Sequence, residues 1–153
     1  MTTPERKQRR GFTLIEIMVT VAILGILTGL AVPMTRVAIR RQKEKELRYD
    51  LWLMRDAIDR YKRAAEGSYF QKADSYTYPK SLEVLVEGVE ITGGKKIRFL
   101  REIPVDPMTG KADWGLHSMD DDPESDSWDE TTIYDVYSKA EGIALDGTHY
   151  RIW

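Results

Sequence analysis

The feature that most limits how this chain can fold is an apolar run near its N-terminus. Between Arg10 and Arg36, 25 consecutive positions contain Glu16 as their only charged residue, whereas 31% of the whole 153-residue chain is charged. Phe12 to Val32 is 21 residues, and a helix of that length, at about 1.5 Å per residue, matches the roughly 30 Å hydrocarbon core of a bilayer. The sequence therefore predicts one membrane-spanning helix followed by a water-soluble part.

Charge is distributed unevenly on the two sides of this helix. The first 11 residues carry four basic side chains against one acid, a balance of +3, so the rest of a chain with net charge −2 carries −5. Basic residues before a span stay cytoplasmic by the positive-inside rule, which places the remainder on the far side of the membrane. An acidic soluble part argues against nucleic acid as a partner, because phosphate binding needs clustered lysine and arginine.

Two simpler interpretations of the N-terminus stay open at this point. A secretory signal peptide is one, because Gly29 and Ala31 form a small-x-small pair before Pro33. The apolar run is longer than the 7 to 15 residues usual for such a signal, however. A plain signal anchor, in which Gly11 and Glu16 have no special role, is the other.

Neither alternative explains Glu16. A carboxylate near the bilayer centre costs up to roughly 2.5 to 3.5 kcal/mol and needs a partner, yet the apolar run contains no cation. A cut between Gly11 and Phe12 would create an α-amino group one helical turn from Glu16 of the same or a neighbouring chain. Gly11 suits such a cut, because a residue without Cβ lets a protease approach the backbone closely.

The block Arg-Arg-Gly-Phe-Thr-Leu-Ile-Glu at residues 9 to 16 resembles the leader junction of type IV pilins and type II secretion pseudopilins. The resemblance implies that prepilin peptidase cuts after Gly11, that the new amine of Phe12 is methylated, and that the apolar helix stays in place. It also implies Glu16 and Pro33 as assembly residues, since such proteins usually carry a proline at the end of this segment.

A helical pattern continues beyond Pro33. Apolar residues recur at spacings of 4, 3, 4, 3 and 4, as expected for one face of a helix: Leu47, Leu51, Met54, Ile58, Tyr61 and Ala65. The other face predicts three i,i+4 ion pairs worth a few tenths of a kcal/mol each: Glu44 with Arg48, Asp56 with Arg60, and Asp59 with Arg63. We expect one helix from Phe12 to Glu66, ended at Gly67, as a spine for a head domain.

Two features surround the end of the predicted span. Gly25 and Gly29 form a small-xxx-small pair, a weak sign of close helix packing, and with Pro33 they make this the least stable part of the helix. A basic group follows, able to face lipid headgroups, acidic surfaces of neighbouring subunits, or solvent: Arg36, Arg40, Arg41, Lys43 and Lys45.

Shorter elements are predicted after Gly67. Residues 78 to 88 have the pattern of a short helix ended by Gly88, and residues 96 to 100 have weak strand character. Residues 132 to 138 and 148 to 153 are rich in β-branched and aromatic residues, with turn chemistry at 145 to 147. The predicted fold class is α+β and type IV pilin-like, with four parts: a leader (1–11), a transmembrane and polymerisation helix (12–33), its amphipathic continuation (34–66), and an α+β head with a small antiparallel sheet (67–153).

The head extends the resemblance to major pseudopilins of the G type. Residues 100 to 107 are similar to the stretch before the first strand of those proteins, and residues 134 to 138 resemble the strand that follows. The chain has no cysteine, so it cannot form the disulfide-closed loop common in adhesive pilins. The favoured function is a structural subunit of a type II secretion pseudopilus, which polymerises through its N-terminal helix to drive protein export across the outer membrane. The alternative is a type IV pilin subunit of a surface fibre.

The resemblance also implies partners and a location. The partners are further copies of the chain, prepilin peptidase, minor pseudopilins, an inner-membrane assembly platform and membrane lipid. The chain would cross the bacterial inner membrane once, with a cytoplasmic N-terminus and a periplasmic head that joins a periplasmic filament.

The density of acids in one predicted loop favours a metal site. Seven acids crowd into the 11 positions from Asp120 to Glu130, and calcium takes six to eight oxygen ligands. The spacing is not that of an EF-hand, but the resemblance implies calcium in the C-terminal part of the head. The candidate ligands are Asp122, Asp126 and Asp146, and a solvated acidic loop without metal remains the alternative. No cofactor is otherwise required.

The sequence offers little to an enzyme. His117 and His149 are the only histidines, and neither a nucleophile elbow nor a glycine-rich phosphate loop is present. A metal-dependent hydrolase built on the acidic loop is the one enzymatic alternative. We expect a structural protein.

Overall fold

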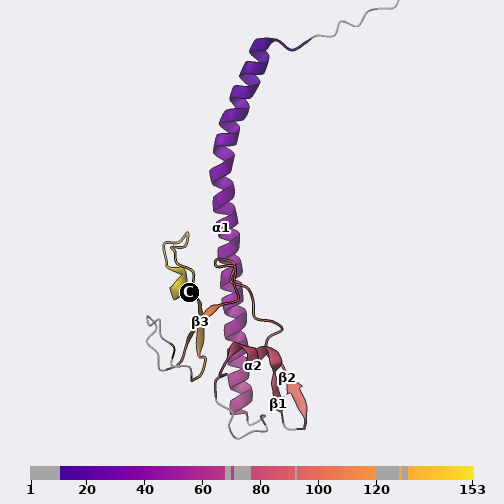
Figure 1. The fold of residues 1–153 in the computed structure, drawn as a ribbon, viewed down its shortest axis with the longest axis vertical. Coiled ribbons are helices and arrows are strands. Elements are labelled where there is room, and N and C mark those ends of the chain that lie inside the picture. The colour runs from indigo at the N-terminus through magenta and orange to yellow at the C-terminus, as the bar shows by residue number, and fades with distance from the viewer. Residues whose placement is uncertain (1–10, 68–69, 71–76, 92, 120–127, 129–130) are drawn as a thin grey trace, which may run out of the picture. The chain divides into compact units, whose positions relative to one another are not determined.

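The computed structural model describes residues 11–67, 70, 77–91, 93–119, 128 and 131–153, without the side chains of residues 30–33. The elements in chain order are α1 (Leu14–Glu66), α2 (Leu82–Glu87), β1 (Val89–Ile91), β2 (Lys95–Ile97), β3 (Trp114–His117), β4 (Asp135–Ser138) and the 3₁₀ helix η1 (Tyr150–Ile152) (Figure 1). The chain divides into two compact units, Met1–Ile39 and Arg40–Trp153, and α1 contributes to both.

Helix α1 confirms the predicted spine. It is 53 residues long and starts two residues later than the sequence pattern predicts. The Gly67 N–H donates to the Arg63 carbonyl at 3.1 Å, after which the helix stops. Its backbone remains helical through Pro33, so the weakened region around the two glycines and the proline does not interrupt the helix.

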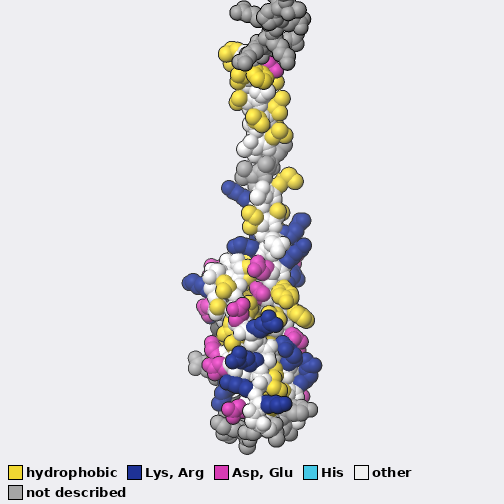
Figure 2. Space-filling view, turned by 90° about the vertical axis from the view of Figure 1, so that its right-hand side faces the viewer, with side chains coloured by type: hydrophobic (Ala, Val, Ile, Leu, Met, Phe, Trp, Pro, Cys, Tyr) yellow, Lys and Arg dark blue, Asp and Glu magenta, His cyan; other side chains and the backbone are white. Residues whose placement is uncertain are grey.

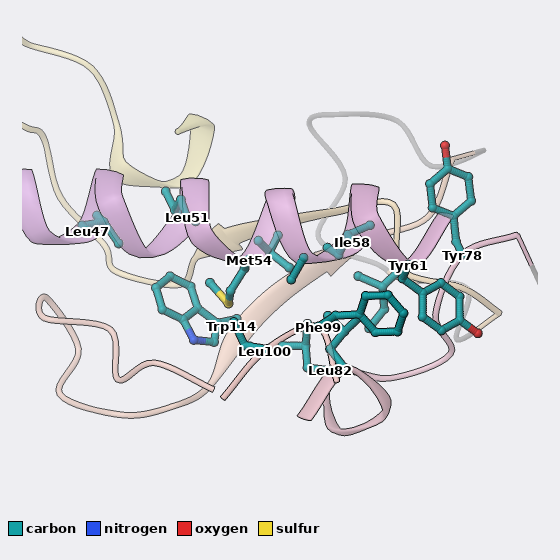
Figure 3. Packing of buried hydrophobic residues seen from close by; sticks show 14 of the residues in the cluster. Leu47, Leu51, Met54, Ile58, Tyr61, Tyr78, Leu82, Phe99, Leu100 and Trp114 are labelled. Atoms are coloured by element: carbon teal, nitrogen blue, oxygen red, sulfur yellow. The ribbon is translucent and has the colours of Figure 1, made fainter. Parts of the chain in front are cut away.

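The core of the second unit lies along one side of α1. The predicted apolar stripe is buried from Leu47 to Tyr61, and Ala65 is partly buried. The side chains from Leu47 to Tyr61 form one buried cluster with Leu82, Phe99, Leu100 and Trp114 from the head (Figure 3). The 3.6-residue period thus located the face on which the head packs.

Helix α2 and the first hairpin cover one end of this face. Helix α2 begins at Leu82, four residues later than predicted. Strands β1 and β2 pair antiparallel with Val89 opposite Ile97. Gly88 joins helix to strand at φ 82°, where an added Cβ would lie 2.4 Å from the Ile97 carbonyl oxygen, so only glycine fits there.

The predicted strand at 96 to 100 is correct only as far as Ile97. The N–H groups of Phe99 and Leu100 both donate to the Leu85 carbonyl, at 2.9 and 3.0 Å. These two residues therefore turn onto the end of α2, with their side chains buried in the core, instead of extending the strand.

Strands β3 and β4 form the second hairpin sheet. They pair antiparallel with Trp114 opposite Ser138 and His117 opposite Asp135. The expected strand at 132 to 138 is confirmed in its second half, and β3 lies after the 100 to 107 stretch where the resemblance places a first strand. Gly115 is required here, because an added Cβ would lie 2.1 Å from the Tyr137 ring.

The predicted strand at 148 to 153 is wrong. His149 makes an isolated bridge to Ile143, and the chain then forms η1. Tyr150 is buried there, and its hydroxyl bonds to Glu44 on α1. The aromatic residues that suggested a strand are instead folded onto the spine.

The turn predicted at 145 to 147 is confirmed. The fold is α+β and pilin-like, as expected, although its strands form two separate two-stranded sheets instead of one.

Candidate functional site

The first turn of α1 places Glu16 next to a helix cap. The Glu16 N–H donates to the Thr13 hydroxyl at 3.3 Å, and the Ile17 N–H donates to the Thr13 carbonyl at 3.2 Å. Thr-x-x-Glu is the spacing of a capping box, and an acid in the first turn is favoured by the helix dipole. The Thr13 hydroxyl therefore caps the first turn through the backbone N–H of residue 16. Sequence reasoning missed this cap, although Thr13 stands three residues before Glu16.

The predicted cleavage junction directly precedes this cap. Gly11 and Phe12 lie in non-helical backbone, Phe12 is 79% exposed, and no atom lies within 4 Å of the position that a Gly11 Cβ would occupy. The residues of the basic leader before them, 1 to 10, lie outside the described part. Both residues that flank the predicted cut are thus exposed, and a protease could reach the bond between them.

The apolar segment after the cap is exposed along the first unit, as Figure 2 shows by its hydrophobic side chains. Its most apolar window has a mean hydropathy of 2.3 and is 0% buried, so this one helix is long and apolar enough to cross a membrane. The hydroxyls of Thr20 and Thr28 donate to the carbonyls of Ile17 and Leu24 within the helix. Both hydroxyls are therefore hydrogen-bonded within the helix, as polar groups must be where lipid excludes water.

Nothing fills the space around the two glycines of the segment. No atom lies within 4 Å of a Cβ built on Gly25 or Gly29, so the described chain itself does not use them for close packing. The Pro33 side chain lies outside the description. The assembly roles of these residues stay predictions.

A polar cluster attaches the C-terminal end of the chain to Arg40 and Glu44 of α1. Glu44 accepts hydrogen bonds from the Tyr150 hydroxyl at 2.8 Å and the Leu145 N–H at 2.9 Å. Arg40 lies 3.4 Å from Glu44 and donates to the Tyr150 hydroxyl and the Ile143 carbonyl. Burial raises the pKa of Tyr150, so the phenol stays neutral and able to donate to Glu44.

Two of the three predicted helix ion pairs are wrong. Glu44 pairs with Arg40 rather than with Arg48, which instead binds Asp146 at 2.6 Å. Arg63 donates to the Asp59 backbone carbonyl and not to its carboxylate. Only Asp56 with Arg60, at 2.9 Å, forms as predicted.

The candidate calcium ligands are not brought together in the described residues. Asp122 and Asp126 lie outside them, and no group of three or more acidic or histidine side chains within the described part could hold a metal ion. Asp146 accepts hydrogen bonds from the Thr148 N–H at 3.0 Å and the Thr148 hydroxyl at 2.6 Å, in addition to Arg48. The Thr148 bonds lower the pKa of Asp146. The described residues thus show Asp146 as part of a turn, with no calcium-binding arrangement.

A long exposed apolar helix with an acid in its first turn, continued as the spine of a small α+β head, defines a type IV pilin-like protein. Residues 6–32 match the family described as the prokaryotic N-terminal methylation motif. The chain is 37% identical over 112 residues to the type II secretion system core protein G of Pseudomonas aeruginosa, covering 67% of this chain and 70% of that protein. It is 30% identical over 107 residues to the core protein G of Escherichia coli, covering 65% and 67%. No solved structure matches the chain.

The chain belongs to the type II secretion system core protein G family, the major pseudopilins. This confirms the resemblance inferred from the leader and the head, and with it the structural function expected for the chain, that of a pseudopilus subunit.

Proposed function

We propose that this chain is made as a precursor, cut between Gly11 and Phe12 by prepilin peptidase and methylated on the new amine of Phe12. The mature chain is then held in the inner membrane by residues 12 to 33, with its N-terminus on the cytoplasmic side and its head in the periplasm. There it polymerises, joined by minor pseudopilins and an inner-membrane assembly platform, into the filament that helps drive proteins across the outer membrane.

The overlap of three features in one segment supports this proposal. The residues that match the methylation motif, 6–32, include both the accessible Gly11–Phe12 junction and the apolar segment whose membrane-length window is 0% buried. An exposed apolar surface of this length needs a cover. Lipid covers it in the single subunit, and the same segments of neighbouring copies cover it in the filament.

Glu16 gives the assembly its register in this proposal. After the cut, the Phe12 ammonium of one copy pairs with the Glu16 carboxylate of an adjacent copy among apolar helices. Desolvation offsets much of the gain from such a pair, so its main contribution is specificity. Removing one partner is costly, on the order of 3 to 5 kcal/mol for a broken buried pair.

The test separates the charge of Glu16 from its place in the helix cap. Glu16→Gln keeps a side chain suited to a capping box but loses the charge, and Thr13→Val removes the capping hydroxyl but keeps the charge. We expect Glu16→Gln to be inserted and cut, with an intact mass equal to residues 12 to 153 plus one methyl group, yet to fail in assembly and secretion. Thr13→Val should still assemble. Normal filaments from Glu16→Gln would show that the charge does not determine assembly, and an uncut wild-type chain in cells with prepilin peptidase would refute the processing.

A further inference from the structure

The C-terminal segment is attached to α1 at the end of the head that follows the predicted span most closely along the chain. The Ile143 carbonyl accepts a hydrogen bond from Arg40, and the Leu145 N–H donates to Glu44 at 2.9 Å. Arg40 comes seven residues after Pro33, which is about 10 Å of helix. The headgroup layer on each side of a bilayer is about 5 to 8 Å thick. Chain length alone therefore keeps this end of the head close to the headgroups.

Two aliphatic side chains are exposed at this end. Ile143 is 51% and Leu145 is 42% exposed, whereas Ala144 between them is buried. The Ala144 N–H donates to the Thr148 carbonyl at 2.7 Å, and its carbonyl accepts from the Gly147 N–H at 3.0 Å. The turn is thus fixed by its own backbone with two aliphatic side chains outside. At a bilayer surface such side chains can be buried at the boundary of headgroups and acyl chains.

Cations of α1 flank the place where this turn is held. Arg41, Lys43 and Lys45 are exposed and form no ion pair with any described residue. At about 100° per residue, Arg41 and Lys45 lie on one side of the row formed by Arg40 and Glu44, and Lys43 lies on the other. The two exposed aliphatic side chains therefore have positive charge on both sides.

This end of the head differs in charge from the rest of the chain. Residues 36 to 48 carry six cations and two acids, a balance of +4, and residues 141 to 149 carry two acids. The two segments together are +2, so the rest of residues 12 to 153, which total −5, carries −7. Positive charge combined with exposed aliphatic groups is the chemistry of proteins that bind anionic lipid surfaces.

We propose that the surface formed by Ile143, Leu145, Arg41, Lys43 and Lys45, here called the basic edge, docks on an anionic phospholipid bilayer. The cations lie at the lipid phosphates, and the two aliphatic side chains lie between the headgroups. The inference rests on the proposed function, because it applies to the single subunit that its span holds in the membrane before assembly. Anionic lipid attracts basic segments within about one Debye length, roughly 8 Å, which is the range that the chain length to Arg40 imposes.

Because the chain has no cysteine, one label can report on the basic edge in the full-length protein. Leu145→Cys carries an environment-sensitive nitrobenzoxadiazole group, and the chain is reconstituted at low density into phosphatidylcholine vesicles, with or without phosphatidylglycerol. Both vesicles contain a lipid with a quencher on its headgroup. We expect bluer emission and stronger quenching with phosphatidylglycerol. The matched control is Glu90→Cys, exposed on β1, which should show no difference, because β1 lies at the opposite end of the head from the C-terminal segment (Figure 1).

Charge variants of the labelled chain test the cations. Arg41→Gln combined with Lys45→Gln should lower the quenching in phosphatidylglycerol vesicles to about half or less, since each basic residue near an anionic surface contributes roughly a fivefold preference. Lys95→Gln combined with Lys96→Gln removes the same charge from exposed positions on β2 and should leave the quenching unchanged. An equal loss in both double variants would show that only net charge matters and would overturn the basic edge.

A second pair of variants tests the aliphatic part. Ile143→Asn should lower the quenching and shift the emission of the Leu145→Cys label to the red. Met119→Asn, at a residue that is 67% exposed beyond the end of β3, is the matched control and should change neither. An Ile143→Asn variant that behaves like the Met119→Asn control would overturn the burial of this side chain between the headgroups.

The outcomes also separate this inference from the proposed function. Equal quenching with and without phosphatidylglycerol, in a chain that alkaline extraction leaves in the vesicles, would overturn the docking and leave the proposed function standing. A chain that alkali removes from the vesicles would overturn both. A blue shift that needs no phosphatidylglycerol and disappears as the protein is diluted in lipid would assign the basic edge to a neighbouring copy and overturn the inference.

Discussion

The guanidinium of Arg48 lies 3.7 Å from the ring centroid of Trp153, the last residue of the chain. The same arginine binds Asp146 at 2.6 Å, and the Trp153 indole N–H donates to Thr148 at 2.6 Å. One side chain of α1 thus holds both the turn at 145 to 147 and the C-terminal residue. The C-terminal segment is attached to the spine through charged side chains of α1, the carboxylate of Glu44 as well as the arginines, rather than through a β-ladder.

This arrangement predicts that Arg48→Ala lowers the free energy of unfolding of the head by about 1 to 1.5 kcal/mol. A cation–π contact at an exposed site contributes about 0.5 to 1 kcal/mol and a surface ion pair about 0 to 1. Denaturant unfolding of a fragment from residue 36, which contains the whole second unit, measures it. Lys45→Ala is the matched control, because Lys45 is exposed, and it should change stability little. Equal losses in both variants would contradict the role of Arg48.

Arg55 makes the stronger attachment. Its guanidinium donates to both carboxylate oxygens of Asp135, at 2.6 and 3.2 Å, to the Val136 carbonyl at 3.1 Å, and to Trp153 O. Arg55→Ala should therefore cost about 2 kcal/mol, as expected for charged hydrogen bonds. Arg55→Lys should recover less than half of this loss, because an ammonium cannot reproduce the planar fork. Arg63→Ala, at an exposed position, serves as control in the same unfolding assay, and full recovery by lysine would refute the geometric argument.

The spacing of apolar residues predicted the spine well, because a helical period can be recognised from neighbouring residues of one segment alone. The stripe from Leu47 to Tyr61 is buried as its spacing requires, and the leader block identified the family. The partners of the charged residues on the same helix could not be found in this way. Arg48 pairs with a residue 98 positions away, and such a long-range contact leaves no trace in i,i+4 spacing.

The C-terminal segment shows a second limit. Tyr150, Ile152 and Trp153 have strand-forming side chains, but that preference mainly reports burial on a packed surface. Here the segment packs against both β4 and α1 without joining a ladder, and the bond from Tyr150 to Glu44 fixes it on α1. Composition indicated that the segment packs, and only the tertiary contacts decided its backbone conformation.

Asp106 lies in the 100 to 107 stretch that resembles the pseudopilins, but neither that resemblance nor any period indicated that its side chain is buried. It is 0% exposed, and its carboxylate accepts hydrogen bonds from the Ser138 hydroxyl at 2.5 Å and the Met108 N–H at 2.7 Å. Asp106→Ala should cost about 2 to 3 kcal/mol, because the buried Ser138 hydroxyl and the part-buried Met108 N–H would both lose their acceptor. Asp106→Asn, which keeps an acceptor and lets the Ser138 hydroxyl rotate, should cost clearly less. Asp113→Ala, at an exposed site, should be nearly neutral, and an equally mild Asp106→Ala would contradict the prediction.

Calcium binding remains a prediction from the acid density between Asp120 and Glu130. If calcium binds, the fragment from residue 36 should melt several degrees higher with millimolar calcium than with chelator, because a ligand at 100 times its Kd adds roughly 2.7 kcal/mol. Neutralising Asp122 and Asp126 to asparagine should remove this difference, whereas Glu90→Gln, at an exposed position on β1, should keep it. Equal melting curves for the unchanged fragment would leave the segment as a solvated acidic loop.

We expect the protonation of Asp50 to favour the folded head in acid, because its pKa is higher in the folded state. Burial raises the pKa of Asp50, and the nearby carboxylates of Glu46 and Asp106 raise it further. A carboxyl whose folded pKa is raised binds its proton more tightly in the folded state. Its favourable contribution is therefore complete below the unfolded pKa, near 3.9, and is lost as pH rises through the higher folded value.

At neutral pH the charge on Asp50 is therefore a cost, which asparagine removes. Asp50→Asn should raise the free energy of unfolding at pH 7 by about 0.5 to 1 kcal/mol, a typical single-residue effect, and the gain should disappear as pH falls below about 3.9. Denaturant unfolding of the fragment from residue 36, repeated across this pH range, measures both. Asp56→Asn breaks the 2.9 Å pair with Arg60 and should be neutral or slightly destabilising at pH 7. A loss of stability at pH 7 in Asp50→Asn would mean that the carboxylate has a favourable partner, and that burial among like charges is not what governs this position.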